Sequence, residues 1–471
     1  MRGKLAPEMR VLFLTVQGFE SDFYGRVGQE LARLGHEVDH VTVSRRASEL
    51  QRARGMRSRA LPELAAELPD WDAETERRRI EREYGLDSIA ELFATDPALA
   101  GKPEAWCVRR TVRDVLALEL ALDELQPDVL VPEVGRETPR VAAHELARAR
   151  GIPTFFLFYT IFPSPLRLYV DTMHAPIVPP ESLRPPTEEE RAEVDAFRRE
   201  FVARNAPIRQ LRRHRLTSRR LRRFAGYVAV YLRERGESPY LRPGRWAREF
   251  AQGAVRARLA RATYSGLGSD RPYVYFPLHD TEDYKIKRVI PQFADQVPVV
   301  ERLAAALPAG HDLVLKEHPL SVGQNRLGLL RRLSRPANVR LVPPETSSHD
   351  LIRNADAVAV ISSTVGLEAL LYEKPVLTLG RPFYSGFGVT VDIESLAELP
   401  TAVPEVLSFR PEPERIDSLL HAAMSACRPG APVLVDDSDE NARLLAASLD
   451  AAARQHVEWR LESDRDPAGA R

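Results

Sequence analysis

A lysine, a glutamate and a histidine occupy consecutive positions at the end of an apolar run in DLVLKEHPLS, residues 312–321. The run has the composition of a buried strand, and Pro319 ends it because proline has no backbone N–H to donate. Side chains alternate along a strand, so Lys316 and His318 share one side while Glu317 points to the other. Two cationic or proton-donating groups on one side could bind an anion. An ordinary polar strand end followed by a turn also fits these residues.

A second polar cluster follows another apolar run, in AVAVISSTVGLEALLYEKPVL. Ser362, Ser363 and Thr364 stand where a helix is expected to begin, and the free N–H groups and positive dipole of a helix start attract anions. We expect Gly366 to let a ligand approach the first turn and Glu368 to accept hydrogen bonds from ribose hydroxyls. The alternative is purely structural, since serine and threonine are common N-caps and glutamate favours a first helical turn.

Both clusters belong to a stretch in which strands and helices alternate. Such alternation predicts a parallel sheet covered by helices on both faces, where ligands bind beyond the carboxyl ends of the strands. The two clusters should therefore meet at one edge of that sheet. The expected strands are PYVYFPL, DLVLKEH, VRLVP, AVAVIS and PVLTLG, with helices expected over 291–307, 324–334, 346–354 and 363–372.

The N-terminal half opens with a strand over 10–16, a helix over 22–34 and a strand over 37–43, which predicts a parallel βαβ unit. The fold class predicted is therefore α/β, with two Rossmann-like domains whose parallel sheets face a central cleft. The division expected is an N-terminal Rossmann-like domain with helical insertions, a C-terminal Rossmann-like domain that carries both polar clusters, and C-terminal helices with a tail. These parts cover residues 1–265, with helical insertions over 46–125 and 180–262, then 266–403 and 404–471.

Composition narrows the protein class. The chain has 471 residues, 44% of them hydrophobic and 28% charged, which are globular values. No apolar stretch is long and clean enough to span a bilayer, no signal peptide is recognised, and Cys107 and Cys427 stand alone without metal spacing. We therefore expect a cytoplasmic protein. No zinc or Walker motif occurs, and no DxD-type pair stands at a strand end of the C-terminal half, so no metal and no cofactor is expected.

Charge is unevenly distributed although the net charge is zero. Between Arg204 and Arg261 there are 17 arginines against three acidic residues. We expect this segment, 204–261, to contact an anionic membrane surface, which would place the protein peripherally at the inner face of the membrane. A merely solvated helical face is the alternative. Nucleic acid is not expected as a partner, because no nucleic-acid-binding motif is present.

Four segments resemble the capsule polysaccharide biosynthesis family: YVYFPLHDTEDY, LVLKEHP, ISSTVGLEALLYEKPVLTLGRPFYSGFGVT and, near the N-terminus, FYGRVGQELARLGHEV. Its characterised members are glycosyltransferases of the GT-B fold that use CMP-activated Kdo (3-deoxy-manno-octulosonate). The His-Pro and Ser-Ser/Thr motifs are also similar to those of GT-B bacterial sialyltransferases. The resemblance is clear over 273–392 and partial over 10–45.

The resemblance implies roles for several residues. His318 contacts the donor phosphate, Ser362, Ser363 and Thr364 hold the phosphate and nucleotide, and Glu368 lies near the ribose. His279 stands where the family often has glutamine, and the role expected of it is donor binding.

The catalytic carboxylate does not transfer by motif, because FYTIFPSPLRLY replaces a Glu-Glu-Gly-type stretch of the family. From their position after the strand DVLVP, Glu133 and Glu137 are the best candidates, with Asp171 third. Surface-loop roles fit these three residues equally well.

Together these features predict a metal-independent transferase that moves a sugar, such as Kdo or a related acidic sugar, from a CMP-linked donor to a capsular or lipid-linked glycan. Lys316 and His318 would stabilise charge on the departing phosphate. Two alternatives remain open. One is a non-hydrolysing UDP-sugar 2-epimerase, and the other is a non-catalytic nucleotide-sugar-binding subunit of glycan assembly.

Overall fold

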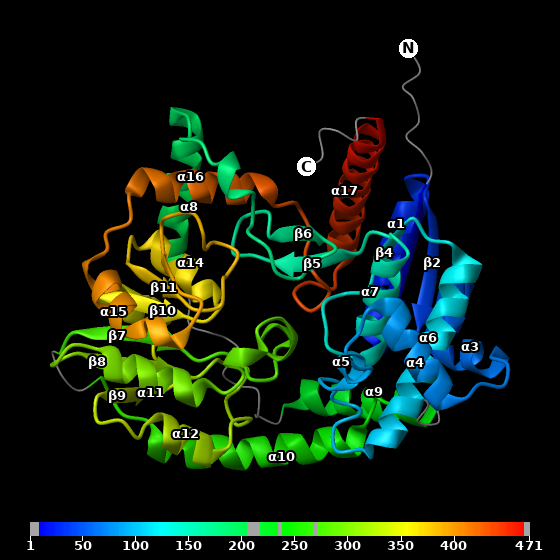
Figure 1. The fold of residues 1–471 in the computed structure, drawn as a ribbon, viewed down its shortest axis with the longest axis horizontal. Helices are drawn as coiled ribbons and strands as arrows, with labels where there is room; N and C mark the ends of the chain where they lie inside the picture. Colours follow the sequence, from blue (N-terminus) through cyan, green and yellow to red (C-terminus); the bar gives the residue numbers. More distant parts are fainter. Residues whose placement is uncertain (1–8, 205–216, 234–237, 268–270, 466–471) are drawn as a thin grey trace.

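The computed structural model describes residues 9–204, 217–233, 238–267 and 271–465 (Figure 1). Its N-terminal half is built on a four-stranded parallel sheet with the strand order β3-β2-β1-β4. β1 is buried over five of its six residues, as its apolar sequence requires. The strands are β1 (Arg10–Thr15), β2 (Glu37–Thr42), β3 (Arg57–Ala60) and β4 (Val129–Val131).

Helices cover both faces of this sheet and enclose a separate apolar core on each face. α1 provides the crossover between β1 and β2, as the sequence pattern predicted. The helices of this half are α1 (Gly18–Arg33), α2 (Arg45–Ala53), α3 (Leu61–Glu67), α4 (Ala73–Tyr84), α5 (Ala90–Phe93), α6 (Glu104–Leu125) and α7 (Thr138–Ala149).

Residues 46–125 differ from the helical insertion expected of them. They contain β3, which pairs in parallel with β2, and α6, whose Val112, Val115 and Leu118 are buried in the same core as Leu12 and Val41 of the sheet. The strand was missed because RSRA is short and charged, and only pairing at the sheet edge makes it a strand.

The C-terminal half contains a six-stranded parallel sheet with the order β12-β11-β10-β7-β8-β9. β7 and β10 are fully buried, so near-continuous apolar sequences form its centre. The strands are β7 (Tyr273–Pro277), β8 (Asp312–Lys316), β9 (Val339–Val342), β10 (Ala357–Val360), β11 (Val376–Thr378) and β12 (Val391–Asp392). The helices are α11 (Gln296–Ala306), α12 (Leu327–Leu333), α13 (Ser348–Asn354), α14 (Thr364–Leu371), α15 (Leu399–Ser408), α16 (Pro413–Ala426) and α17 (Asp439–Arg465).

Several segments connect the two halves. An antiparallel hairpin, β5 (Phe155–Tyr159) and β6 (Leu166–Val170), follows the first sheet. α8 (Glu188–Arg204) then packs on the second half, where Val194 and Phe197 join the core of the C-terminal sheet. α9 (Ser218–Arg233) and α10 (Pro243–Ala260) follow, and α10 runs along the lower edge of the molecule in Figure 1 to reach α12.

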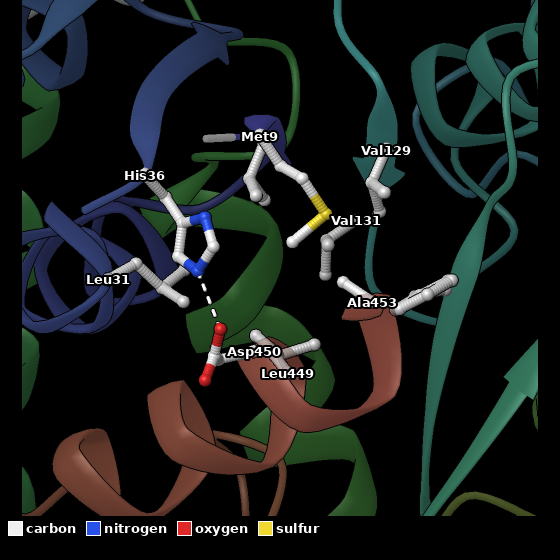
Figure 2. Close-up of a pocket in the computed structure, with 10 residues that line it drawn as sticks. Met9, Leu31, His36, Val129, Val131, Leu449, Asp450 and Ala453 are labelled. Atoms are coloured by element: carbon white, nitrogen blue, oxygen red, sulfur yellow. Dashed lines mark hydrogen bonds and ion pairs between the residues drawn. The ribbon is translucent and has the colours of Figure 1, made fainter. Parts of the chain in front are cut away.

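The last helix returns to the N-terminal half. α17 lies against α1, and Leu449 and Ala453 pack in the core with Met9 and Val131 (Figure 2). His36, in the turn between α1 and β2, bonds Asp450 of α17 through its Nε2 at 2.7 Å. The cavity beside this pair has a volume of only about 10 Å³, so it is a packing gap rather than a ligand site.

Two parallel α/β sheets that border a shared cleft constitute the GT-B arrangement, and the predicted fold class is thereby confirmed. Among the described residues, no helix has both the length and the apolar character needed to cross a membrane.

Candidate active site

A cleft of about 1960 Å³ lies between the two halves. Val134, Leu157 and Phe158 contribute to it from the N-terminal half, and most of its wall comes from the carboxyl ends of β7, β8 and β10. Seven of the residues predicted from the sequence line it: His279, Lys316, His318, Ser362, Ser363, Thr364 and Glu368. Glu133, Glu137 and Gly366 are not part of its wall.

Lys316 is a buried cation at the end of β8, 2% exposed. Its Nζ donates hydrogen bonds to the Thr346 carbonyl and to Ser348 Oγ, both at 2.6 Å. Burial lowers the pKa of Lys316 to about 8, although the nearby Glu368 and Glu345 act in the opposite direction. The ammonium group is therefore mostly charged at neutral pH. It has three donors, so one remains for a ligand in the cleft.

His318 lies on the same side of the strand end. Its Nδ1 accepts a hydrogen bond from the backbone N–H of Leu320 at 3.3 Å. Burial lowers the pKa of His318, against the opposing effect of Asp280 and Asp283. A neutral imidazole whose Nδ1 accepts must carry its proton on Nε2. The histidine is thus set up as a neutral Nε2–H donor at the cleft wall.

Glu317 points the other way, as strand alternation predicted. It is 1% exposed, accepts a hydrogen bond from the Tyr264 hydroxyl, and accepts another from Asn325 Nδ2 at 2.8 Å. Burial raises the pKa of Glu317, and the two hydrogen bonds counteract that rise. This network fixes the strand end on the side opposite to Lys316 and His318. It therefore holds the corner that carries His318 in place.

His279, at the end of β7, supports the start of α14. Its Nε2 accepts a hydrogen bond from the Ser362 backbone N–H at 3.0 Å, and Gln296 holds its own backbone. Burial lowers the pKa of His279 to about 3, so the ring is neutral. The Ser362 amide is consequently occupied by the histidine. In contrast, Ser362 Oγ is buried without a hydrogen-bond partner among the described residues, which leaves it available to a ligand.

The other residues at the start of α14 divide between capping the helix and facing the cleft. Ser363 is the N-cap and accepts from the Val365 N–H at 3.2 Å. Thr364 lies in the first turn and hydrogen-bonds Glu368. Gly366 does not admit a ligand as expected, because its missing side chain makes room for Tyr384: a Cβ there would lie 2.1 Å from the tyrosine hydroxyl oxygen.

Glu368 lines the cleft one turn into α14, in the position predicted. Burial raises its pKa to about 7, while Lys316 and the Thr364 hydroxyl favour the ionised form. A carboxyl group with this pKa can accept hydrogen bonds from sugar hydroxyls when ionised and donate one when protonated.

Glu133 lies directly behind the cleft wall, next to the lining residue Val134. It is 7% exposed and has a φ of 60°, a left-handed conformation that costs energy for a glutamate. Its Oε1 accepts from the Tyr24 hydroxyl, and burial raises its pKa to about 7 despite the nearby Arg140. A strained, buried carboxyl group of this kind is typical of functional sites.

Glu137 has a structural environment. Its Oε2 accepts from the Arg136 backbone N–H and lies 3.0 Å from Arg140 Nε. Arg140 in turn bonds Glu20 at 2.7 Å, so the carboxylate belongs to a network that shapes the loop before α7. Asp171 likewise caps the hairpin by accepting from the Thr154 N–H at 2.7 Å.

Comparison with known families places this cleft in context. The family model described as capsule polysaccharide biosynthesis protein matches residues 192–423. The match covers 232 of the 471 residues of the chain. This region contains all the predicted donor-side residues, so the resemblance inferred from sequence motifs is confirmed.

Curated relatives match over shorter stretches. The capsule polysaccharide modification protein LipA of Neisseria meningitidis serogroup B is 36% identical over 81 residues, 17% of this chain and 12% of LipA. The capsule polysaccharide export protein KpsS of Escherichia coli is 34% identical over 82 residues, 17% of this chain and 21% of KpsS. The matches thus span about an eighth to a fifth of the length of these relatives.

Similar solved structures are more distant. Thermosulfurimonas dismutans KpsC, described as a beta Kdo 2,7 transferase, covers 68% of this chain and 88% of its own, with 17% identity and a TM-score of 0.33. A likeness at that level decides neither fold nor activity. The fold assignment rests on the sheet topology.

The capsule-family region also holds cleft residues that the sequence analysis did not single out. Asp280, Asp283, Tyr284 and Lys285 line the cleft from the loop after β7. The environment raises the pKa of Asp283 and lowers that of Lys285, in both cases mainly through lost solvation. The signal available in the sequence was HDTEDYK, polar residues directly after an apolar strand, which is the pattern that identified Lys316.

This loop also reaches the N-terminal half. Tyr284 makes an edge contact with Phe158, with 6.1 Å between ring centroids, and Lys285 Nζ lies 5.8 Å from the same ring. Arg136 and Glu282 form an ion pair at 2.7 Å. The loop therefore spans the cleft at the donor-side wall and brings Asp283 close to the hairpin of the N-terminal half.

Proposed function

We propose that this protein is a glycosyltransferase that transfers a sugar from a nucleotide-activated donor to a glycan of capsule assembly. One observation carries the proposal: Lys316, His318 and the start of α14 lie on one wall of an interdomain cleft. Departure of a nucleotide leaving group adds negative charge to its phosphate. A fixed ammonium group, an Nε2–H donor and a helix start are suited to stabilise that charge.

The donor proposed is CMP-linked, with Kdo or a related acidic sugar, in keeping with the motif resemblance to CMP-sugar transferases. In this arrangement His318 and Lys316 contact the phosphate, and Ser362 Oγ forms a hydrogen bond with the nucleotide. Glu368 accepts hydrogen bonds from the ribose hydroxyls. His279 contributes indirectly by fixing the Ser362 backbone.

Two carboxyl groups are candidates for the reacting carboxylate. Asp283 lines the cleft beside His318, and its raised pKa fits a group that takes up a proton or contacts developing positive charge. Glu133 approaches from the N-terminal half and has a pKa of about 7. Glu137 is not proposed as the reacting carboxylate, because it already accepts a hydrogen bond from the Arg136 N–H and forms an ion pair with Arg140.

No divalent metal is required in this proposal, because Lys316 and His318 supply the phosphate contacts. Full transfer activity after incubation with EDTA and gel filtration is the expected result. Loss of activity that Mg²⁺ or Mn²⁺ restores would contradict it.

A nucleotide panel tests the donor assignment. CMP is expected to raise the melting temperature more than UDP, GDP or ADP. A clear preference for UDP or GDP would exclude a CMP-linked donor but would not change the fold assignment.

Incubation with a nucleotide sugar alone tests the epimerase alternative, since an epimerase converts its substrate without an acceptor. Nucleotide binding without turnover on any acceptor would favour a non-catalytic subunit.

Peripheral membrane contact is proposed for the outer face of α9 and α10. Arg222, Arg233 and Arg248 are exposed there, together with Leu232 (67% exposed) and Val255 (59%). Residues 205–216 and 234–237 of the arginine-rich segment lie outside the described residues. Vesicles rich in anionic lipid should co-sediment the protein at low salt, and failure to do so would exclude this contact.

A further inference from the structure

Not all arginines of the arginine-rich segment face outward. Arg258 and Arg261, together with Ala254 and Ala257, line the interdomain cleft. These four positions recur with the period of a helix and define one face of α10 and its continuation. Arg248, Val255 and Leu259 follow the same period on a different, exposed face. α10 therefore presents one face to the cleft and another to the surroundings.

The two cleft arginines are exposed rather than paired with acidic side chains in the described part of the chain. Both are exposed, and neither guanidinium makes a hydrogen bond or an ion pair with the residues that the structure describes. Other arginines of α10 are occupied: Arg245 pairs with Glu249 at 2.7 Å, and Arg256 donates to the Gln324 carbonyl at 3.4 Å. Arg258 and Arg261 thus retain their full hydrogen-bonding capacity.

Two contacts fix this pair of arginines beside the phosphate-binding corner. Arg256 ties α10 to the loop after His318, and Tyr264, just beyond α10, bonds Glu317 behind the same corner. Arg258 and Arg261 lie between these attachments along the chain. The cleft wall accordingly contains a second cationic group next to Lys316 and His318, supplied by a helix that precedes the donor sheet.

We infer that Arg258 and Arg261 form a binding subsite for anionic groups, carboxylate or phosphate, of the acceptor. The planar guanidinium of arginine matches the geometry of both anions. The donor phosphate already has Lys316, His318 and the start of α14, so an additional pair supplied by a different element, α10 and its continuation, serves the other substrate. This inference rests on the proposed function, because it assigns the acceptor side of the same cleft.

Binding of a carboxylated oligosaccharide tests the subsite directly. The probes are a hexamer of galacturonate and a neutral hexamer of glucose, titrated against the full chain by calorimetry. The wild type should bind the galacturonate hexamer in preference to the neutral one. Arg258→Gln with Arg261→Gln should weaken that binding by about tenfold or more, the effect of losing charge-assisted hydrogen bonds. Arg302→Gln with Arg335→Gln, which changes the same net charge at two exposed positions outside the cleft, should leave it unchanged.

CMP titration on the same variants separates the acceptor from the donor. Its affinity should be equal in the wild type and in both double variants. An equal loss of CMP and oligosaccharide affinity in the Arg258/Arg261 variant would assign the pair to the donor and overturn the inference. The inference also fails if the wild type does not distinguish the two hexamers, or if the control variant loses as much affinity as the cleft variant.

Failure of the proposed function would look different. If no nucleotide binds any form of the protein while the galacturonate hexamer still requires Arg258 and Arg261, the chain binds anionic glycans but is not a nucleotide-sugar transferase. Melting temperatures confirm that the variants fold, and exposed arginines without partners should not affect them.

Discussion

The two halves of the cleft differ in how their polar side chains are satisfied. On the donor side, Ser362 Oγ is buried without a partner among the described residues, and His318 presents an Nε2–H to the cleft. In the N-terminal half, Arg140 forms ion pairs with both Glu20 and Glu137 around the loop before α7. Because Ser362 also lines the cleft, its missing partner indicates where a ligand binds, whereas carboxylates paired with a buried arginine indicate structural support. Glu133 is intermediate, since it is bonded by Tyr24 but strained and close to the cleft.

The largest effect is expected for His318→Ala. Turnover should fall by about 10²- to 10³-fold, because the phosphate gains charge in the transition state and the lost donor matters most there. CMP affinity should decrease by only about tenfold. The melting temperature should be nearly unchanged, since the ring makes a single hydrogen bond to its own turn. Transfer kinetics, CMP titration and thermal melting on one preparation check the three expectations.

His36→Ala is the matched control for this variant. His36 bonds Asp450 at 2.7 Å and its side chain is 1% exposed, so its loss should destabilise the protein by about 2 kcal/mol without changing the rate per folded molecule. If His318→Ala instead reproduced the His36→Ala pattern, the corner at His318 would be structural and the site would lie elsewhere.

Glu133→Gln tests whether the N-terminal half contributes chemistry. If the ionised carboxylate is required, turnover should fall by about 10²-fold, and the wild-type rate should rise with pH through about 7, the pKa of Glu133. The glutamine variant should lose that pH dependence, whereas Glu137→Gln should keep it. A rate that still rises through pH 7 in Glu133→Gln would assign the titration to Glu368, whose pKa is also about 7.

Stability gives an independent check on Glu133. Its folded-state pKa of about 7 exceeds the ordinary value of 4.5, so the folded protein binds the proton more tightly than the unfolded chain. This contribution to stability is complete below about pH 4.5 and disappears as pH rises through 7, with a size of at most about 3 kcal/mol. The glutamine variant should therefore gain in melting temperature relative to the wild type between pH 5 and pH 8. An equal difference at both pH values would show that Glu133 is ionised throughout.

Gly366→Ala distinguishes a glycine required by packing from one that admits a ligand. The added Cβ would meet the Tyr384 hydroxyl, so destabilisation of about 1 to 3 kcal/mol is expected, with CMP affinity retained by the folded fraction. Gly226→Ala in α9 is the control, because a Cβ added there would meet no atom within 4 Å and alanine favours a helix. Unchanged stability together with lost CMP affinity in Gly366→Ala would restore the ligand-approach interpretation.

The smallest effects are expected for two adjacent serines. Ser363→Ala removes the N-cap of α14 and should cost about 1 kcal/mol of stability. Ser362→Ala removes a hydroxyl that has no partner among the described residues, so melting should be unaffected or slightly improved, while CMP affinity falls several-fold. Calorimetric titration and thermal melting of both variants check this contrast. Identical effects of the two substitutions would show that the serines do not divide into a helix cap and a ligand-binding hydroxyl.

Most of the donor half could be predicted from the sequence because its signals are local. The expected helix over 363–372 is observed at Thr364–Leu371, and the strand that ends at Lys316 lies where the apolar run indicated. Carboxyl ends of parallel strands share one edge, so Lys316 and Ser362 were expected to meet. The place of Asp283 in the cleft was missed, because a run of polar residues after a strand does not show which of its side chains faces the cleft.

The sequence by itself determined the two alternating α/β units, the polar strand ends and the start of α14, since periodicity and capping depend on neighbours in the chain. Only the tertiary structure decided that β3 joins the sheet, that Tyr384 fills the space at Gly366, and that Glu137 forms an ion pair with Arg140. It also divided the arginines of α10 between the cleft and the outer face. These outcomes depend on contacts between residues far apart in the chain, where burial and charge pairing are set by the partner rather than by the local sequence.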